Sequence, residues 1–154
     1  MLTIRELTSA ELPLLTRLFE YNDPDAMLKE NSVKIASGRI SVFGVFEEGE
    51  LIGELRAMYE HERPLFASRG VRAYLYAYRI LQEHQGKGKG SLLLKSILEL
   101  LEGKGYREFT VGVEDDNERA LHIYQKEGFT KCISREKEEY QGDEYEYALY
   151  LKCT

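Results

Sequence analysis

The sequence of 154 residues has the length of one domain, which we expect to span residues 1–154. Its composition, with 43% hydrophobic and 31% charged residues, is typical of a globular protein. The formal net charge of −6 argues against general nucleic-acid binding, which requires a basic surface. No apolar run is long enough to span a membrane, no signal-peptide pattern begins the chain, and the two cysteines form no disulfide framework, so we expect a cytoplasmic protein without membrane contact.

The first half of the chain combines strand and helix signals. Thr8 and Glu11 form a capping-box pattern, which is typical of a helix N-terminus. Tyr74, Tyr76 and Tyr78 alternate along a strand, so we expect their three rings on one face of a sheet. The predicted elements are strands over 2–7, 41–46, 51–59 and 72–80, and helices from residue 8 and over 25–37.

The second half alternates helices with strands, which indicates a parallel crossover within a mixed α/β sheet. Apolar residues recur at helical spacing between Ser91 and Glu102, and Gly103 is typical of a helix end. The predicted elements are helices over 91–102 and 117–127 and strands over 108–113, 129–136 and 144–152. We therefore expect a mixed central sheet of about six to seven strands flanked by about four helices.

A glycine-rich segment, Gln85-Gly86-Lys87-Gly88-Lys89-Gly90, connects a predicted strand to a predicted helix. Backbone N–H groups at such a helix N-terminus bind anions, and glycine lets the backbone approach a phosphate closely. The two lysines add local positive charge to an acidic chain. The segment lacks the Walker spacing, and Ser91 stands where a dinucleotide fingerprint requires glycine. The sequence thus predicts an anion-binding loop outside these two classes.

Gln85, Gly88 and Gly90 fit a different pattern, Gln/Arg-x-x-Gly-x-Gly/Ala, and a second pattern follows, Asn117-x-x-Ala120-x-x-x-Tyr124-x-x-x-Gly128-Phe129. By these two motifs, and by its order of elements, the chain resembles the GNAT superfamily of acetyl-CoA-dependent N-acetyltransferases over nearly its whole length. The resemblance implies a GNAT-like fold and acetyl-CoA as co-substrate, with no metal ion. It also implies splayed strands beside the loop, and it leaves a homodimer open because homodimers are common in the family.

The resemblance implies a specific set of CoA-binding residues. Backbone amides of the loop would hold the pyrophosphate, and the free edge of the preceding strand would bind the pantetheine arm. Asn117 would contact the same arm and can also cap the following helix. The implied cofactor-binding residues are Tyr78, Arg79, Ile80, Gln85, Gly86, Lys87, Gly88, Lys89, Gly90 and Asn117.

Tyr124 aligns with the family's tyrosine that protonates the departing thiolate. A phenol with a pKa near ~10 can donate to a thiolate of pKa ~8.5, although Tyr124 also fits a purely packing role on its helix. The general base stays open between Glu54 and Glu114, each of which also fits as a surface carboxylate. A family branch that modifies protein N-termini carries a glutamate where this chain has Gly112, which counts against that branch.

The resulting prediction is an N-acetyltransferase that moves an acetyl group from acetyl-CoA to a primary amine by direct attack. The acceptor would be a small molecule or a peptide. Two alternatives are a CoA-binding regulatory domain without catalysis and a structural interaction domain. The three histidines show no metal-ligand grouping.

Overall fold

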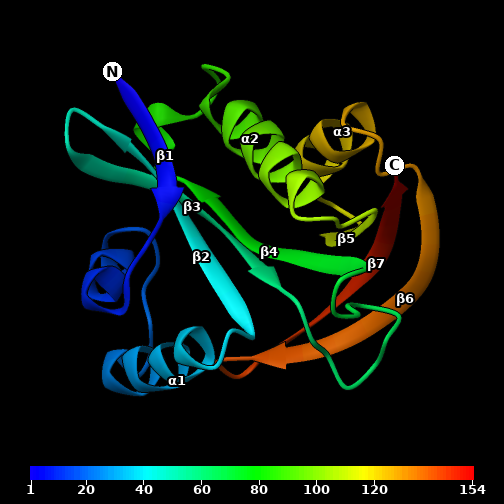
Figure 1. Ribbon diagram of the computed structural model, residues 1–154, viewed down its shortest axis with the longest axis horizontal. Helices are drawn as coiled ribbons and strands as arrows, with labels where there is room; N and C mark the ends of the chain where they lie inside the picture. Colours follow the sequence, from blue (N-terminus) through cyan, green and yellow to red (C-terminus); the bar gives the residue numbers. More distant parts are fainter.

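The computed structural model describes residues 1–154 and contains one sheet of seven strands in the order β1-β2-β3-β4-β5-β7-β6 (Figure 1). β4 and β5 pair in parallel, whereas the other neighbouring strands are antiparallel. This arrangement confirms the predicted mixed α/β sheet. The strands are β1 (Leu2–Glu6), β2 (Ile40–Glu47), β3 (Glu50–Met58), β4 (Arg72–Ile80), β5 (Glu108–Glu114), β6 (Lys131–Tyr140) and β7 (Asp143–Cys153).

Helices cover both faces of the sheet (Figure 1). The larger hydrophobic core packs α2 and α3 against one face, and the smaller core packs η1 and α1 against the other. None of these helices combines the length and the apolar character needed to cross a membrane. The helices are η1 (Ser9–Arg17), α1 (Pro24–Ala36), η2 (Gln82–His84), α2 (Lys89–Gly103) and α3 (Glu118–Lys126).

Two predicted elements differ in detail from the structure. The first predicted helix forms as the 3-10 helix η1, and Pro13 lies inside it. Proline has no N–H to donate, and in an α-helix its ring would clash with the carbonyl of the residue four positions earlier. The final hairpin is longer than predicted, because β6 continues to Tyr140. β6 lies at the edge of the sheet, where its charged side chains can point to solvent.

A β-bulge in β4 overturns the expected single face of tyrosines. Ala77 has φ 52°, and the pairing of Arg56 with Tyr76 but of Glu54 with Arg79 leaves one extra residue in β4. An extra residue moves the following side chains to the opposite face. The Tyr74 and Tyr76 rings therefore stack on each other at 5.5 Å between centroids, whereas Tyr78 packs against α3 on the other face.

β4 and β5 separate at the centre of the sheet, as the resemblance implies. Their pairing runs from Arg72 opposite Glu108 to Leu75 opposite Val111 and then stops. Beyond this point β4 stays paired with β3, and β5 stays paired with β7. The last residues of β4 consequently have no strand partner on this edge, which lies beside the N-terminus of α2, and the Ile80 carbonyl accepts a hydrogen bond from the Gln85 side chain at 2.8 Å.

Candidate active site

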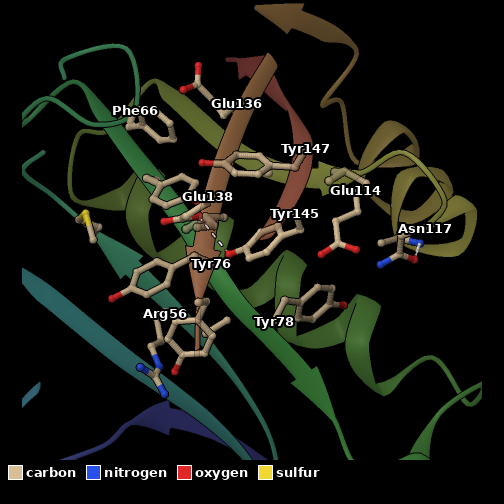
Figure 2. A pocket seen from close by; sticks show the side chains of 18 of the residues that line it. Arg56, Phe66, Tyr76, Tyr78, Glu114, Asn117, Glu136, Glu138, Tyr145 and Tyr147 are labelled. Carbon is tan, nitrogen blue, oxygen red and sulfur yellow. Dashed lines mark hydrogen bonds between the residues drawn. The ribbon is translucent and has the colours of Figure 1, made fainter. Parts of the chain in front are cut away.

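Two adjoining cavities lie where β4 and β5 separate. A cavity of about 410 Å³ borders the glycine-rich loop, and one of about 750 Å³ extends toward the β6–β7 hairpin (Figure 2). Tyr78, Asn117 and Ala120 line both cavities, so the two meet at these residues. The larger cavity therefore adjoins the one at the loop.

The loop presents an uncapped helix N-terminus to the smaller cavity. Gly86 and Gly88 have φ of 76° and 79°, a conformation that favours glycine, and Gly88 is the N-cap of α2 without a side-chain cap. A Cβ at Gly90 would lie 2.8 Å from the Tyr78 hydroxyl oxygen, a distance shorter than Cβ atoms in proteins keep from their neighbours. The free N–H groups of α2 are consequently open to an anion.

The charges around the loop differ from what the sequence suggests. Lys89 Nζ lies 2.9 Å from both Glu47 and His84, so its charge is held beside the loop, and Lys87 is exposed. Arg119, which the motifs do not single out, lines the smaller cavity and donates to Gln85 at 3.3 Å. Arg119 lies in the first turn of the helix that Asn117 caps. This position could have indicated from the sequence that its side chain lies near the loop.

Asn117 accepts a hydrogen bond from the Ala120 amide at 3.1 Å, which confirms its predicted helix-capping role. In Figure 2 it lies at the cavity beside Glu114. The Asn117 side chain thus lies where the two cavities adjoin. The resemblance places the pantetheine arm at this point.

Tyr124 lies on α3 with only 6% of its surface exposed, and it lines the larger cavity. Its ring packs 5.8 Å from Tyr78 and 5.7 Å from Phe129, between centroids. Burial, with a smaller effect of Tyr78, raises the pKa of Tyr124 well above its usual range. The phenol therefore keeps its proton at neutral pH, as a proton donor must.

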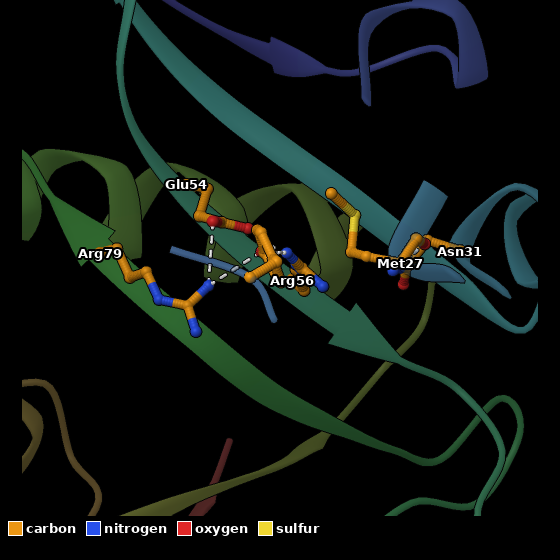
Figure 3. A network of polar contacts seen from close by, with 6 residues as sticks. Met27, Asn31, Glu54, Arg56 and Arg79 are labelled. Atoms are coloured by element: carbon orange, nitrogen blue, oxygen red, sulfur yellow. Dashed lines mark hydrogen bonds and ion pairs between the residues drawn. The ribbon is translucent and has the colours of Figure 1, made fainter. Parts of the chain in front are cut away.

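The two candidate bases occupy different environments. Glu114, at the end of β5, lines the larger cavity and forms no ion pair (Figure 2). Glu54 is fully buried, is not among the lining residues, and accepts hydrogen bonds from Arg56 at 2.7 Å and Arg79 at 3.1 Å (Figure 3). The structure thus brings Glu114, but not Glu54, into the same cavity as Tyr124.

Gly112 makes room for an aromatic ring. A Cβ at this position would lie 2.7 Å from a ring carbon of Tyr147, a β7 residue that pairs with Glu114 of β5. A carboxylate at position 112 would collide with that ring. A side chain at position 112 would therefore require the Tyr147 ring to move.

The chain matches the model of the acetyltransferase (GNAT) family over residues 3–129, and it belongs to that family. It is 28% identical over 81 residues to N-alpha-acetyltransferase 30 of Schizosaccharomyces pombe, over 52% of this chain and 54% of that protein, so it matches about half the length of this curated relative.

Solved structures share the fold over nearly their whole length. A ribosomal-protein-alanine N-acetyltransferase from Brucella melitensis superimposes with a TM-score of 0.76 at 20% identity, covering 99% of each chain. A putative acetyltransferase from Salmonella typhimurium with its cofactor acetyl-CoA has a TM-score of 0.75 at 17% identity, over 99% of this chain and 94% of that one.

The residues at the two cavities fit acetyl-CoA. The buried Tyr78 hydroxyl has no hydrogen-bond partner, and it lies where the cavities meet. Polar groups are paired when buried, so this oxygen is suited to a ligand that carries donors or acceptors along the passage. No group of three or more His, Cys, Asp or Glu side chains is arranged to hold a metal ion.

Proposed function

We propose that this chain is a single-domain cytoplasmic enzyme that transfers an acetyl group from acetyl-CoA to a primary amine by direct attack. One observation carries the proposal: the cavity at the glycine loop shares Tyr78, Asn117 and Ala120 with a larger cavity that is lined by both Tyr124 and Glu114. A regulatory CoA-binding domain would need the loop but not a buried phenol and a free carboxylate in one cavity.

The CoA-binding residues would act mainly through the backbone. N–H groups of residues 85–90 would hold the phosphates at the α2 N-terminus, with Arg119 adding a charge, while the free edge of residues 78–80 and Asn117 would bind the pantetheine arm. When bound, acetyl-CoA supplies the acetyl group and a thiolate leaving group.

Glu114 and Tyr124 would share the proton transfers. An amine of pKa ~10.4 is mostly protonated at neutral pH, and its nitrogen can attack only after losing a proton. Glu114 takes this proton, directly or through water, so that the nitrogen can bond to the thioester carbon. As the carbon–sulfur bond breaks, Tyr124 gives its proton to the sulfur and the nitrogen loses its second proton to water. Glu114 then releases its proton to solvent, and Tyr124 regains one.

A Glu114→Gln variant is expected to lose about 100-fold or more in kcat/KM, because an amide cannot accept the proton. The wild-type profile of kcat/KM should rise with pH along an acid limb, and this limb should flatten or shift in the variant. Initial rates of thiol release across pH, with CoA affinity measured in parallel, check this. An unchanged profile would reject Glu114 as the base.

Glu54→Gln provides the contrast between the two candidates. Removing the carboxylate leaves the buried Arg56 and the partly buried Arg79 without their shared counter-ion. We expect the free energy of unfolding to fall by about 3 kcal/mol while the acid limb of the pH profile stays in place. A lost acid limb in a variant of nearly normal stability would instead identify Glu54 as the base.

Arg119→Gln is expected to weaken CoA binding by about 10-fold at low salt and by less at high salt, because it removes a charge at the edge of the smaller cavity. Lys87→Ala, which removes an exposed lysine of the same loop, should weaken binding by less than about 3-fold. Calorimetric titration with CoA at two salt concentrations compares them. Equal losses in both variants would contradict a specific contact by Arg119.

The proposed function as a whole is tested by thiol release from acetyl-CoA with a panel of amines. Turnover that depends on an amine supports it. CoA binding without turnover for any amine would favour the regulatory alternative.

A further inference from the structure

Two arginines share one carboxylate at one end of the larger cavity. Arg56 and Arg79 both donate to Glu54, and both line the cavity, whereas Glu54 lies behind them (Figure 3). Arg56 has 7% and Arg79 has 25% of its side chain exposed, so both guanidinium groups are largely removed from water.

This cluster, Glu54–Arg56–Arg79, keeps an uncompensated positive charge. Guanidinium groups are charged at any relevant pH, so two of them and one carboxylate leave one net positive charge. Their other partner, the Tyr21 hydroxyl, at 2.7 Å from Arg56 and 3.5 Å from Arg79, is neutral. Lys34, which lines the cavity and forms no ion pair, adds to the positive character. A partly buried guanidinium of this kind is a strong site for a carboxylate.

The other side of the cavity carries free negative charge. Glu114 forms no ion pair, and the carboxylate of Glu138 is contacted only by the Tyr145 hydroxyl, at 3.0 Å. Figure 2 shows Glu114 across the cavity from Arg56. The cavity therefore carries charges of both signs, with the free Glu114 carboxylate across from Arg56.

The arginine end is closed off from behind. The Arg79 guanidinium lies 4.1 Å from the centroid of the Phe19 ring, and Phe19 contacts Tyr140 at 6.0 Å between centroids. The Gln141 side chain accepts a hydrogen bond from the Asn22 amide at 2.8 Å, which joins the hairpin tip to the segment before α1. Phe19 and the hairpin tip therefore leave less room beside Arg79 for a continuing peptide chain than for a small molecule.

We propose that the acceptor is a small amino carboxylate, with its ammonium group directed at Glu114 and its carboxylate held by Arg79 and Arg56. This inference rests on the proposed acetyltransferase function. The stacked rings of Tyr74 and Tyr76 line the same cavity, so an acceptor with an aromatic or other apolar side chain would bury that surface.

Matched acceptors test the inference directly. We expect kcat/KM for phenylalanine and methionine to exceed that for their carboxamides by about 10-fold or more, because the amide loses a charge-assisted pair. Acceptors that lack the carboxylate, such as phenethylamine, should be similarly poor. If such amines or peptide N-termini are acetylated equally well or better, the inference fails while the proposed function stands. If no amine of any class releases thiol, both fail.

Variants locate the carboxylate site. Arg79→Gln should reduce the ratio of kcat/KM for the free acid to that for the amide by about 10-fold, and Arg79→Lys should retain part of the preference. Arg17→Gln, a matched loss of charge on η1 outside the cavity, should keep the wild-type ratio. The ratio is informative even if Arg79 variants bind CoA less well, since both acceptors share that loss. An unchanged ratio in folded Arg79→Gln would overturn the assignment.

Discussion

Replacing Gly90 with valine is expected to weaken CoA binding by about 100-fold or more. The new Cβ would lie 2.8 Å from the Tyr78 hydroxyl and 3.4 Å from the Ile80 side chain, so the Tyr78 ring, α2 or the end of β4 must move. All three line the smaller cavity that is proposed to hold the cofactor, so any of these movements alters its shape. Calorimetric titration of the variant with CoA measures the loss.

Gly103→Val is the matched control, because Gly103 lies in the same helix with no atom within 4 Å of its ideal Cβ. This control should bind CoA like the wild type. Thermal unfolding of both variants separates a local effect on the loop from general destabilisation. Normal CoA affinity in a folded Gly90→Val variant would show that the cofactor lies elsewhere.

Tyr124→Phe is expected to reduce kcat by about 10²–10⁴-fold while the affinity for acetyl-CoA stays nearly intact. The change removes one hydroxyl and keeps the ring that packs against Tyr78 and Phe129, so stability should change little. A proton delivered to the departing sulfur matters mainly in the transition state, which is why the loss should fall on kcat. Steady-state rates and CoA titration give both quantities.

An acetyl donor with a less basic leaving thiolate is the chemical control for Tyr124. Such a donor needs less help from an acid, so it should partly restore the rate of Tyr124→Phe. Near wild-type turnover with acetyl-CoA would leave Tyr124 as a packing residue only. An equal loss with both donors would indicate that the hydroxyl positions acetyl-CoA and donates no proton.

Local sequence patterns were sufficient for the family, the mixed sheet and the glycine loop that precedes α2. The conformations of Gly86 and Gly88, the helix cap at Asn117 and the periodicity of α2 each depend on residues within a few positions of one another. Such short-range constraints are readable because backbone sterics and helix periodicity act locally. The 3-10 geometry of η1 was also encoded locally, by Pro13, although the capping box alone did not indicate it.

The polar lining of the larger cavity was decided by the tertiary structure. The bulge at Ala77 sends Tyr78 toward α3 and Arg79 toward Glu54, and an alternating pattern alone predicts the opposite for Tyr78. Arg119 meets Gln85 only because α3 packs beside the loop. The paired charges of Glu54, Arg56 and Arg79 come from two neighbouring strands. Glu54 and Arg56 lie two residues apart on β3, but cross-strand register brings Arg79 to Glu54 and helix packing brings Arg119 to Gln85. No local spacing encodes these last two contacts, because they depend on the packing of the whole core.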